Sequence, residues 1–253
     1  MRAVSTHRVV RAYSAIAETY DAAVGIADFI RIRRAFETLV TRYGIQFGSA
    51  VDVGCGTGLF ACYLSQCWSV PVFAVDRSPE MIRVASRNCR NSNIRFLQQD
   101  FRRLCLPCPV DLATANTYTI NHLMNEAEMD LAFQQICANL KPGGHLIFDL
   151  LTHCQPFRSS HTYVRRVRVF NRELMHRIRW DPSRRLLSIV ILHRTQKPAP
   201  AAIEKYVGRG YSPLEVGKRL RNAGFRIRGI HDATTLRVAG ACPARVIMVA
   251  RKS

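Results

Sequence analysis

Short apolar runs alternate with amphipathic stretches between residues 49 and 150. The runs have the length of strands, and the stretches repeat their apolar residues at helical spacing. The predicted strands lie near 50–54, 71–75, 94–98, 110–114 and 145–149, and the predicted helices lie near 58–67, 78–89 and 126–140. Strands that alternate with helices form a parallel sheet with right-handed crossovers, so this pattern predicts an α/β fold.

Two other regions depart from this rhythm. Residues 9–43 carry apolar positions at helical spacing, interrupted at Gly25 and followed by Gly44, which predicts two helices ahead of the sheet. After the fifth strand, residues 158–211 contain short strand-like segments separated by Asp181-Pro182-Ser183 and Lys197-Pro198-Ala199-Pro200. This spacing predicts an inserted antiparallel meander.

Local signals also predict where individual elements begin and end. Ser212-Pro213 has the side chain and the fixed φ that favour a helix N-terminus, so a helix is expected from there to Gly224. Gly143, in Leu140-Lys141-Pro142-Gly143-Gly144, is expected to be the left-handed cap that ends the helix before strand five. The last predicted strands lie near 225–230 and 245–250.

The stretch Val51-Asp52-Val53-Gly54-Cys55-Gly56-Thr57-Gly58 joins the first strand to a helix through alternate glycines. Because glycine lacks Cβ, its backbone adopts positive φ and approaches a ligand closely, so we expect a nucleoside cofactor on this loop. A dinucleotide fingerprint places its third glycine one residue later than Gly58. The spacing therefore disfavours a nicotinamide oxidoreductase.

Acidic residues follow successive strands of the predicted sheet. Asp52 is in the first strand, Asp76 ends the second and Asp100 follows the third. Ligands bind beyond the carboxyl ends of strands in open α/β sheets, so these carboxylates are expected to meet at one site. A carboxylate at Asp76 has the acceptors to bind both hydroxyls of a ribose.

The glycine spacing and the three acids together resemble the class I S-adenosylmethionine-dependent methyltransferases, of the type that acts on a nitrogen or oxygen of small molecules. The resemblance implies a seven-stranded, mostly parallel sheet whose last strand is antiparallel. It also implies lid helices in residues 1–48, a cofactor domain in 49–157 and 212–253, and a substrate roof in 158–211.

The resemblance assigns cofactor roles to individual residues. Asp52 helps to hold the methionyl amino group, Asp76 binds the ribose, and Asp100 and Phe101 bind and pack on the adenine. A lid tyrosine, Tyr20 with Tyr13 as the other candidate, lies near the methionyl carboxylate. The implied cofactor residues are Tyr20, Asp52, Gly54, Gly56, Gly58, Asp76, Arg77, Met81, Asp100, Phe101 and Asn116.

Methyl transfer from a sulfonium needs alignment and exclusion of water, and it needs a base only when the acceptor is protonated or a poor nucleophile. His122, in the segment after strand four, is the candidate base because its ordinary pKa leaves a neutral fraction near neutral pH. That segment lacks the Asn/Asp-Pro-Pro-Tyr/Phe motif of enzymes that methylate adenine or glutamine amides. The sequence contains neither a metal-ligand cluster nor a nucleophile elbow, so no metal is expected.

Composition adds a strong positive charge. The formal net charge is +19, and arginines concentrate between 165 and 185. The excess is explained by a solvated basic surface, by an anionic small acceptor or by nucleic acid. No known nucleic-acid module accompanies the arginines.

Length and apolar content fit one α/β domain with an insertion: the chain has 253 residues, of which 48% are hydrophobic. There is no membrane-spanning run or secretory signal, so we expect a cytoplasmic protein with reduced thiols at its nine cysteines. The N-terminal arginines also fit an organellar transit peptide, although residues 13–21 fit the mature fold. Cys105 and Cys108 form a lone pair without zinc-site partners.

We therefore expect a methyltransferase, acting as a monomer or homodimer, that transfers a methyl group from S-adenosylmethionine to a small molecule, with secondary metabolism as a candidate setting. Two alternatives stay open. One is an RNA or protein methyltransferase that uses the basic surface, and the other is a non-catalytic protein that binds S-adenosylmethionine.

Overall fold

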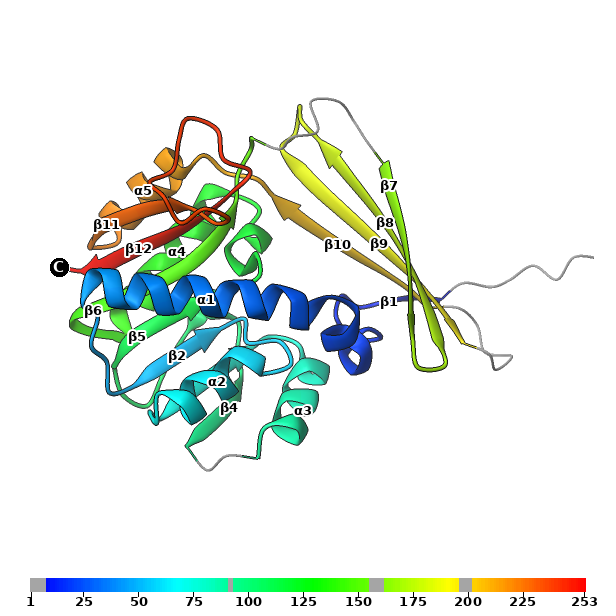
Figure 1. Ribbon diagram of the computed structural model, residues 1–253, viewed down its shortest axis with the longest axis horizontal. Coiled ribbons are helices and arrows are strands. Elements are labelled where there is room, and N and C mark those ends of the chain that lie inside the picture. Colours follow the sequence, from blue (N-terminus) through cyan, green and yellow to red (C-terminus); the bar gives the residue numbers. More distant parts are fainter. Residues whose placement is uncertain (1–7, 91–92, 155–161, 196–201) are drawn as a thin grey trace, which may run out of the picture.

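The computed structural model describes residues 8–90, 93–154, 162–195 and 202–253, and these residues form two sheets flanked by helices (Figure 1). The larger sheet has seven strands in the order β11-β12-β6-β5-β2-β3-β4. Its strands are β2 (Ala50–Val53), β3 (Val72–Asp76), β4 (Ile94–Gln98), β5 (Val110–Ala115), β6 (Leu140–Leu151), β11 (Phe225–Asp232) and β12 (Arg245–Lys252). β12 runs antiparallel to β6 and β11, whereas the other pairs are parallel, so the predicted fold class is confirmed.

The smaller sheet has five strands in the order β1-β10-β9-β8-β7 and extends to one side of the larger one (Figure 1). Its strands are β1 (Arg8–Val10), β7 (Thr162–Val169), β8 (Arg172–Asp181), β9 (Leu186–Thr195) and β10 (Ala202–Arg209). β7 to β10 form the antiparallel meander expected from the sequence, and β1 adds a parallel strand to β10. Residues 155–161 and 196–201, which belong to the predicted insertion, lie outside the described residues.

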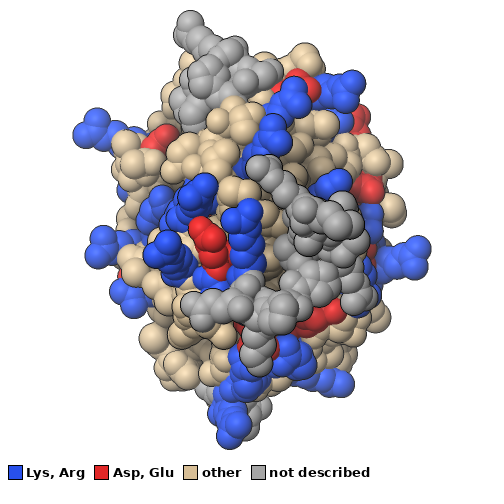
Figure 2. Space-filling model, turned by 90° about the vertical axis from the view of Figure 1, so that its right-hand side faces the viewer, with Lys and Arg blue, Asp and Glu red and all other residues tan. Residues whose placement is uncertain are grey.

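The smaller sheet carries much of the positive charge. Lys and Arg side chains gather on the side of the molecule that it occupies, and few acids lie among them (Figure 2). The exposed arginines of β7 and β8 are Arg165, Arg166, Arg168, Arg177 and Arg179. These side chains are solvated, which accounts for part of the net charge without a ligand.

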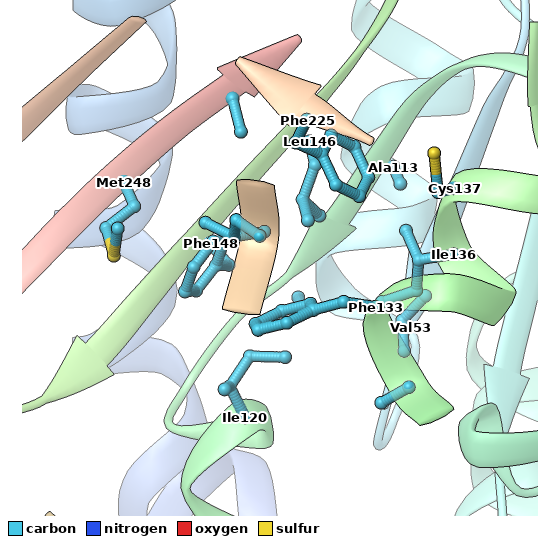
Figure 3. Close-up of a cluster of buried hydrophobic side chains, with 14 of the residues drawn as sticks. Val53, Ala113, Ile120, Phe133, Ile136, Cys137, Leu146, Phe148, Phe225 and Met248 are labelled. Carbon is cyan, nitrogen blue, oxygen red and sulfur yellow. The ribbon is translucent and has the colours of Figure 1, made fainter. Parts of the chain in front are cut away.

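Helices cover both faces of the larger sheet (Figure 1). The helices are α1 (Ile26–Tyr43), α2 (Leu59–Cys67), α3 (Pro79–Asn88), α4 (Glu126–Ala138) and α5 (Pro213–Asn222), with short turns η1 (Ala17–Thr19), η2 (Asp21–Gly25), η3 (Phe101–Arg103) and η4 (Thr119–His122). Side chains alternate across a strand, so β12 sends Met248 to the α4 and α5 side and Val249 to the α1 and α2 side. Figure 3 shows the first of these cores, in which Phe133 of α4 packs near Phe148 of β6.

The helix starts follow the expected signals. The Ser78 hydroxyl accepts a hydrogen bond from the Met81 amide at 3.2 Å, with Pro79 at the first position of α3. Ser212 and Glu215 form a reciprocal capping box at the start of α5. The cap of α3 is important for the site because it fixes the chain directly after Asp76.

Two local predictions are wrong. The N-terminal region contains one long helix preceded by short turns and a strand, since Gly25 keeps a helical φ of −63°. A Cβ there would lie 2.9 Å from Asp21 Oδ1, so this glycine allows close packing instead of breaking a helix. Gly143 does have a positive φ of 76°, but α4 already ends at Ala138, and Leu140 begins β6.

The expectation of reduced thiols is also wrong for two pairs of cysteines. Cys62 is bonded to Cys89, and Cys154 is bonded to Cys242, across sequence separations of 27 and 88 residues. Such pairing depends on tertiary contacts, which spacing does not reveal. Among the described residues, no helix has both the length and the apolar character needed to cross a membrane.

Candidate functional site

One cavity lies beyond the carboxyl ends of β2, β3 and β5, beneath the N-terminal segment and the start of α1. Apart from Gly58, every residue predicted to bind the cofactor lines this cavity, and so does His122. The predicted members of the lining are Tyr20, Asp52, Gly54, Gly56, Asp76, Arg77, Met81, Asp100, Phe101, Asn116 and His122. Residues far apart in sequence therefore meet at the strand tips, as expected for an open α/β sheet.

The glycines of the loop have different surroundings. A Cβ at Gly58 would lie 3.0 Å from the Ala85 Cβ of α3, so this glycine permits helix packing. Gly56 has a φ of +54°, and among the described residues other than its chain neighbours no atom lies within 4 Å of the place where its Cβ would stand. Because Gly56 also lines the cavity, that open space is available to a ligand at the backbone.

Asp76 connects the glycine loop to the start of α3 through two hydrogen bonds. Its Oδ2 accepts a hydrogen bond from the Gly56 amide at 2.9 Å, and its Oδ1 accepts one from the Ser78 amide at 2.8 Å. Burial nevertheless raises the pKa of the Asp76 carboxyl above its ordinary value. Asp76 therefore links the glycine loop to the start of α3 and keeps acceptor lone pairs at the cavity wall.

Asp52 is nearly inaccessible, with 2% of its surface exposed. Its Oδ1 accepts a hydrogen bond from the Thr114 hydroxyl at 2.8 Å and one from the Asn116 amide at 3.4 Å. Burial raises the pKa of Asp52 to about 7, although these bonds act in the opposite direction. The side-chain hydrogen bonds of Asp52 come from a hydroxyl and an amide, which are both neutral. A cationic group bound beside Asp52 would therefore stabilise its ionised carboxylate.

Asp100 already has a cationic partner that the sequence analysis missed. Arg102 Nη2 lies 2.5 Å from Asp100 Oδ2, and Arg102 Nη1 lies 2.8 Å from Glu128 Oε1. The Arg102 hydrogen bond holds the pKa of Asp100 below its ordinary value. The sequence signal for this pair was the position of Arg102 two residues after Asp100. Asp100 is the N-cap of η3, and η3 contains Arg102.

Residues of the N-terminal turns form part of the cavity wall. The Thr57 hydroxyl donates a hydrogen bond to Asp21, which joins η2 to the glycine loop. Tyr20 lines the cavity, and burial raises the pKa of its hydroxyl, so this tyrosine stays a neutral hydrogen-bonding group. Phe29 and Ile32 of α1 add apolar lining that sequence reasoning did not identify.

A strained turn follows β5. Thr117 and Tyr118 are consecutive non-glycine residues with φ values of 54° and 63°, a conformation that costs about 1–3 kcal/mol for each residue. The Tyr118 amide donates to Asp149 Oδ2 at 3.1 Å, and the Arg245 guanidinium lies 4.3 Å from the centre of the Tyr118 ring. The turn presents Thr117 to the cavity and begins η4.

Buried charges connect this turn to α1. Arg245 Nη2 lies 2.9 Å from Asp149 Oδ2, and Arg245 Nη1 lies 3.4 Å from Asp28 Oδ1 in α1. Asp28 and Asp149 are both buried. A buried charge requires such partners, so these residues connect β6, β12 and α1 at a fixed geometry. They lie behind the cavity and do not line it.

His122 and Tyr13 meet at the edge of the cavity. Tyr13 Oη lies 2.7 Å from His122 Nε2, and the Val207 backbone also hydrogen-bonds the imidazole. Burial and the nearby Arg77 charge lower the pKa of His122 to about 4, so the ring is neutral at neutral pH. Tyr13 has a strained φ of 66°, and the sequence gives no sign that it contacts His122.

A second cavity adjoins the first at these two rings. Tyr13, Arg77, Arg102 and His122 line both cavities. The members found only in the second are Ala12, Met124, Glu128, Lys205, Tyr206 and Val207. One cavity thus lies at the strand tips, and the other lies between η4 and β10, with a tyrosine-histidine pair at their junction.

The residues of the first cavity fit an adenosyl sulfonium. Gly56 leaves space at the backbone, Asp76 has acceptors for a ribose, and Asp52 has a buried carboxylate for a cationic amino group. Phe101 adds an apolar surface for a base. The second cavity leaves room for a separate molecule on the far side of the Tyr13–His122 pair.

The fold and the lining of this site resemble those of the class I S-adenosylmethionine-dependent methyltransferases. Residues 50–144 match the family model for the methyltransferase domain. The cofactor of this class is S-adenosylmethionine.

Two curated relatives that match part of the chain are named as methyltransferases. A putative methyltransferase from Geobacillus is 30% identical over 141 residues, which cover 54% of this chain and 57% of the relative. A dTDP-3-amino-3,6-dideoxy-alpha-D-glucopyranose N,N-dimethyltransferase from Streptomyces fradiae is 29% identical over 122 residues, which cover 48% of this chain and 47% of the relative. The chain thus matches about half the length of these relatives.

Solved structures extend the likeness in fold to nearly the whole chain. An S-adenosylmethionine-dependent methyltransferase from Clostridium acetobutylicum has a TM-score of 0.78 at 20% identity, covering 95% of this chain and 99% of the other. A sugar N-methyltransferase from Streptoalloteichus has a TM-score of 0.78 at 19% identity, covering 100% and 99%. At these identities the comparison concerns the fold, which includes the region around the five-stranded sheet.

Proposed function

We propose that this protein transfers a methyl group from S-adenosylmethionine to the amino nitrogen of a small molecule, with an amino sugar carried on a phosphate-bearing group as the leading acceptor class. The observation that carries the proposal is the Tyr13–His122 pair at the junction of the two cavities, with Tyr13 Oη 2.7 Å from His122 Nε2. The relatives named as amino-sugar and sugar N-methyltransferases support the acceptor class.

The bound cofactor supplies an electrophilic methyl group with a good leaving group. The protein therefore has to orient the acceptor and keep its nitrogen unprotonated. His122 is neutral and accepts the Tyr13 hydroxyl proton in a hydrogen bond, which leaves the lone pairs of Tyr13 Oη free to accept an N–H of the acceptor. This contact aims the nitrogen lone pair toward the first cavity.

The environment also favours a neutral amine. Burial and the Arg77 charge lower the pKa of His122, and the same influences lower the pKa of an amine bound beside it. The amine then attacks without prior transfer of a proton to the protein, and His122 acts mainly by orienting Tyr13. Tyr13 is thus our candidate catalytic residue and His122 is its positioning residue, and a direct role of His122 as base is required only for an acceptor that arrives protonated.

An anionic acceptor fits the second cavity. Arg77, Arg102 and Lys205 line it together with one acid, Glu128, and Arg102 is already paired with Asp100 and Glu128. Arg77 and Lys205 are therefore the cations that we propose for a phosphate. The contributions of Tyr13 and Tyr20 from the N-terminus and of Lys205 to Val207 from β10 support the lid and roof roles of residues 1–48 and 158–211.

The test combines binding with product analysis. Calorimetry should show that S-adenosylmethionine binds to the protein and that NADH does not. Incubation with labelled cofactor and dTDP-3-amino-3,6-dideoxyglucose should give an N-methylated product and S-adenosylhomocysteine. dTDP-glucose, which offers only hydroxyls on its sugar, is the control for nitrogen as the methylated atom.

Each result bears on a separate part of the proposal. Absence of binding to S-adenosylmethionine and S-adenosylhomocysteine would contradict the proposed activity as a whole. Methylation of dTDP-glucose without methylation of the amino sugar would contradict nitrogen as the acceptor. RNA that binds with a steep dependence on salt and becomes methylated would favour the nucleic-acid alternative.

A further inference from the structure

Glu204 of β10 is a buried carboxylate outside both cavities, with 0% of its surface exposed. Its Oε1 accepts hydrogen bonds from the amides of Ala15 at 2.5 Å and Ile16 at 3.3 Å. Its Oε2 accepts one from the Tyr206 hydroxyl and contacts His193 Nε2 at 3.1 Å. A carboxylate this deeply buried needs such donors, so its position is fixed by the groups around it.

These partners place Glu204 between the five-stranded sheet and the N-terminal segment. His193 and Tyr206 belong to neighbouring strands of the sheet, whereas Ala15 and Ile16 directly follow the turn that contains Tyr13. The hydrogen bonds from His193, Tyr206 and Ala15 outweigh burial and hold the pKa of Glu204 below its ordinary value. The charged form therefore persists where it anchors the segment.

Tyr13 needs this anchor because its backbone is strained. Its φ of 66° lies in the left-handed region, which a bulky residue adopts only when the surrounding structure enforces it. The Tyr13 amide donates to Tyr206 Oη at 3.4 Å, and the two rings lie 4.5 Å apart at their centres. Tyr206 therefore contacts Glu204 with its hydroxyl and Tyr13 with its ring and oxygen.

We propose that Glu204 is a positioning residue for methyl transfer, which holds Tyr13 against His122 through Tyr206 and through the Ala15 and Ile16 amides. This inference rests on the proposed function. It assigns the five-stranded sheet a part in the chemistry that is separate from lining the second cavity. The path runs from a carboxylate in β10 to a tyrosine in the N-terminal segment and then to the histidine of η4.

The first test compares two isosteric changes in the same sheet. Glu204→Gln keeps the shape of the side chain but places an amide NH₂ against donors that need an acceptor. Glu173→Gln is the control, because Glu173 of β8 precedes buried Leu174 and points to the opposite face. Glu204→Gln should lower kcat by roughly tenfold or more while the Kd of S-adenosylmethionine stays within about twofold. Glu173→Gln should leave both unchanged.

A double-mutant cycle shows whether Glu204 acts through Tyr13. Tyr13→Phe removes the hydroxyl that contacts His122, so Glu204→Gln should cost little in addition if both changes break one path. Losses that multiply would show that Glu204 acts independently of Tyr13 and would overturn the inference. The acceptor is dTDP-3-amino-3,6-dideoxyglucose, and thermal unfolding of each variant is recorded alongside kcat and KM.

The remaining outcomes are also decisive. If Glu204→Gln does not fold, Tyr206→Phe replaces it in the cycle, because that change removes only the hydroxyl shared by Glu204 and the Tyr13 amide. If Glu204→Gln and Tyr206→Phe both turn over at the wild-type rate, this inference is overturned, whereas the proposed function is not affected. Absence of methyl transfer by the wild-type protein would instead overturn the proposed function, and this inference with it.

Discussion

The proposed reaction site has two sides, which we call the cofactor side and the acceptor side, and they are built in different ways. The cofactor side comes from successive strand tips of one sheet, where Gly56, Asp76 and Asp100 follow one another along the chain and meet through parallel pairing. The acceptor side joins Tyr13, His122 and Tyr206, which belong to the N-terminal segment, η4 and the smaller sheet. The first arrangement is encoded locally, whereas the second depends on tertiary contacts.

This difference also appears in the backbone. On the cofactor side, positive φ falls on glycines, which adopt it at little cost. Outside the glycine loop, it falls on Tyr13, which contacts His122, and on Thr117 and Tyr118 in the turn before η4, where hydrogen bonds and buried charges hold the chain. We therefore expect changes on the cofactor side to alter binding of S-adenosylmethionine and changes on the acceptor side to alter turnover.

The largest expected effect is on the cofactor side, at Gly56. Gly56→Ala and Gly44→Ala are matched changes, since both glycines have positive φ and, in the part of the chain that the structure describes, only chain neighbours lie within 4 Å of either missing Cβ. Each should lower the free energy of unfolding by about 1–2 kcal/mol through backbone strain. Only Gly56→Ala places a methyl group in the cavity, so its Kd for S-adenosylmethionine should rise by roughly a hundredfold or more in calorimetry.

Gly44→Ala controls for the strain, because Gly44 caps the end of α1 and does not line the cavity. Equal loss of cofactor binding in both variants would show that backbone strain, and not contact with the ligand, explains the effect. The proposed contact between Gly56 and the cofactor would then be contradicted.

The next effect is on the acceptor side, at His122. His122→Ala removes the acceptor of the Tyr13 hydroxyl proton, so Tyr13 loses its orientation. We expect kcat to fall by roughly ten- to a hundredfold, with the Kd of S-adenosylmethionine unchanged within about twofold. Stopped reactions that quantify S-adenosylhomocysteine give kcat, and calorimetry gives Kd. A matching loss of cofactor affinity would erase the proposed division of roles.

The same division explains what the sequence could predict. Glycine spacing and acids at strand ends are local patterns, so the larger sheet was predicted from them, and all the proposed cofactor residues except Gly58 line the first cavity. Gly58 was placed with the ligand-facing glycines because spacing does not show that its Cβ would meet Ala85. The sequence also could not distinguish Gly25 as a packing glycine from one that ends a helix, since its helical φ depends on contact with Asp21.

The acceptor side was less accessible to sequence reasoning. His122 was identified from its place after a strand, but its contact with Tyr13 spans 109 positions in the chain. Glu204 carries no motif, and its five-stranded sheet includes β1 from the opposite end of the chain. Buried polar contacts between distant segments arise only once the fold is complete, so neither spacing nor composition signals them.

The smallest predicted effect concerns pH and separates cofactor binding from stability. Burial raises the pKa of Asp52 to about 7, and the proposed partner of Asp52 is the cationic amino group of the cofactor. Binding therefore requires the ionised form, and the Kd should rise by about tenfold between about pH 8 and about pH 6. The free energy of unfolding changes in the opposite direction. Because the pKa of Asp52 is raised in the folded protein, its contribution to stability is fully present at pH values below its pKa in the unfolded chain. This contribution is lost as pH rises through about 7. Asp52→Asn should flatten the binding profile, and an unchanged slope in that variant would remove Asp52 from the cofactor side.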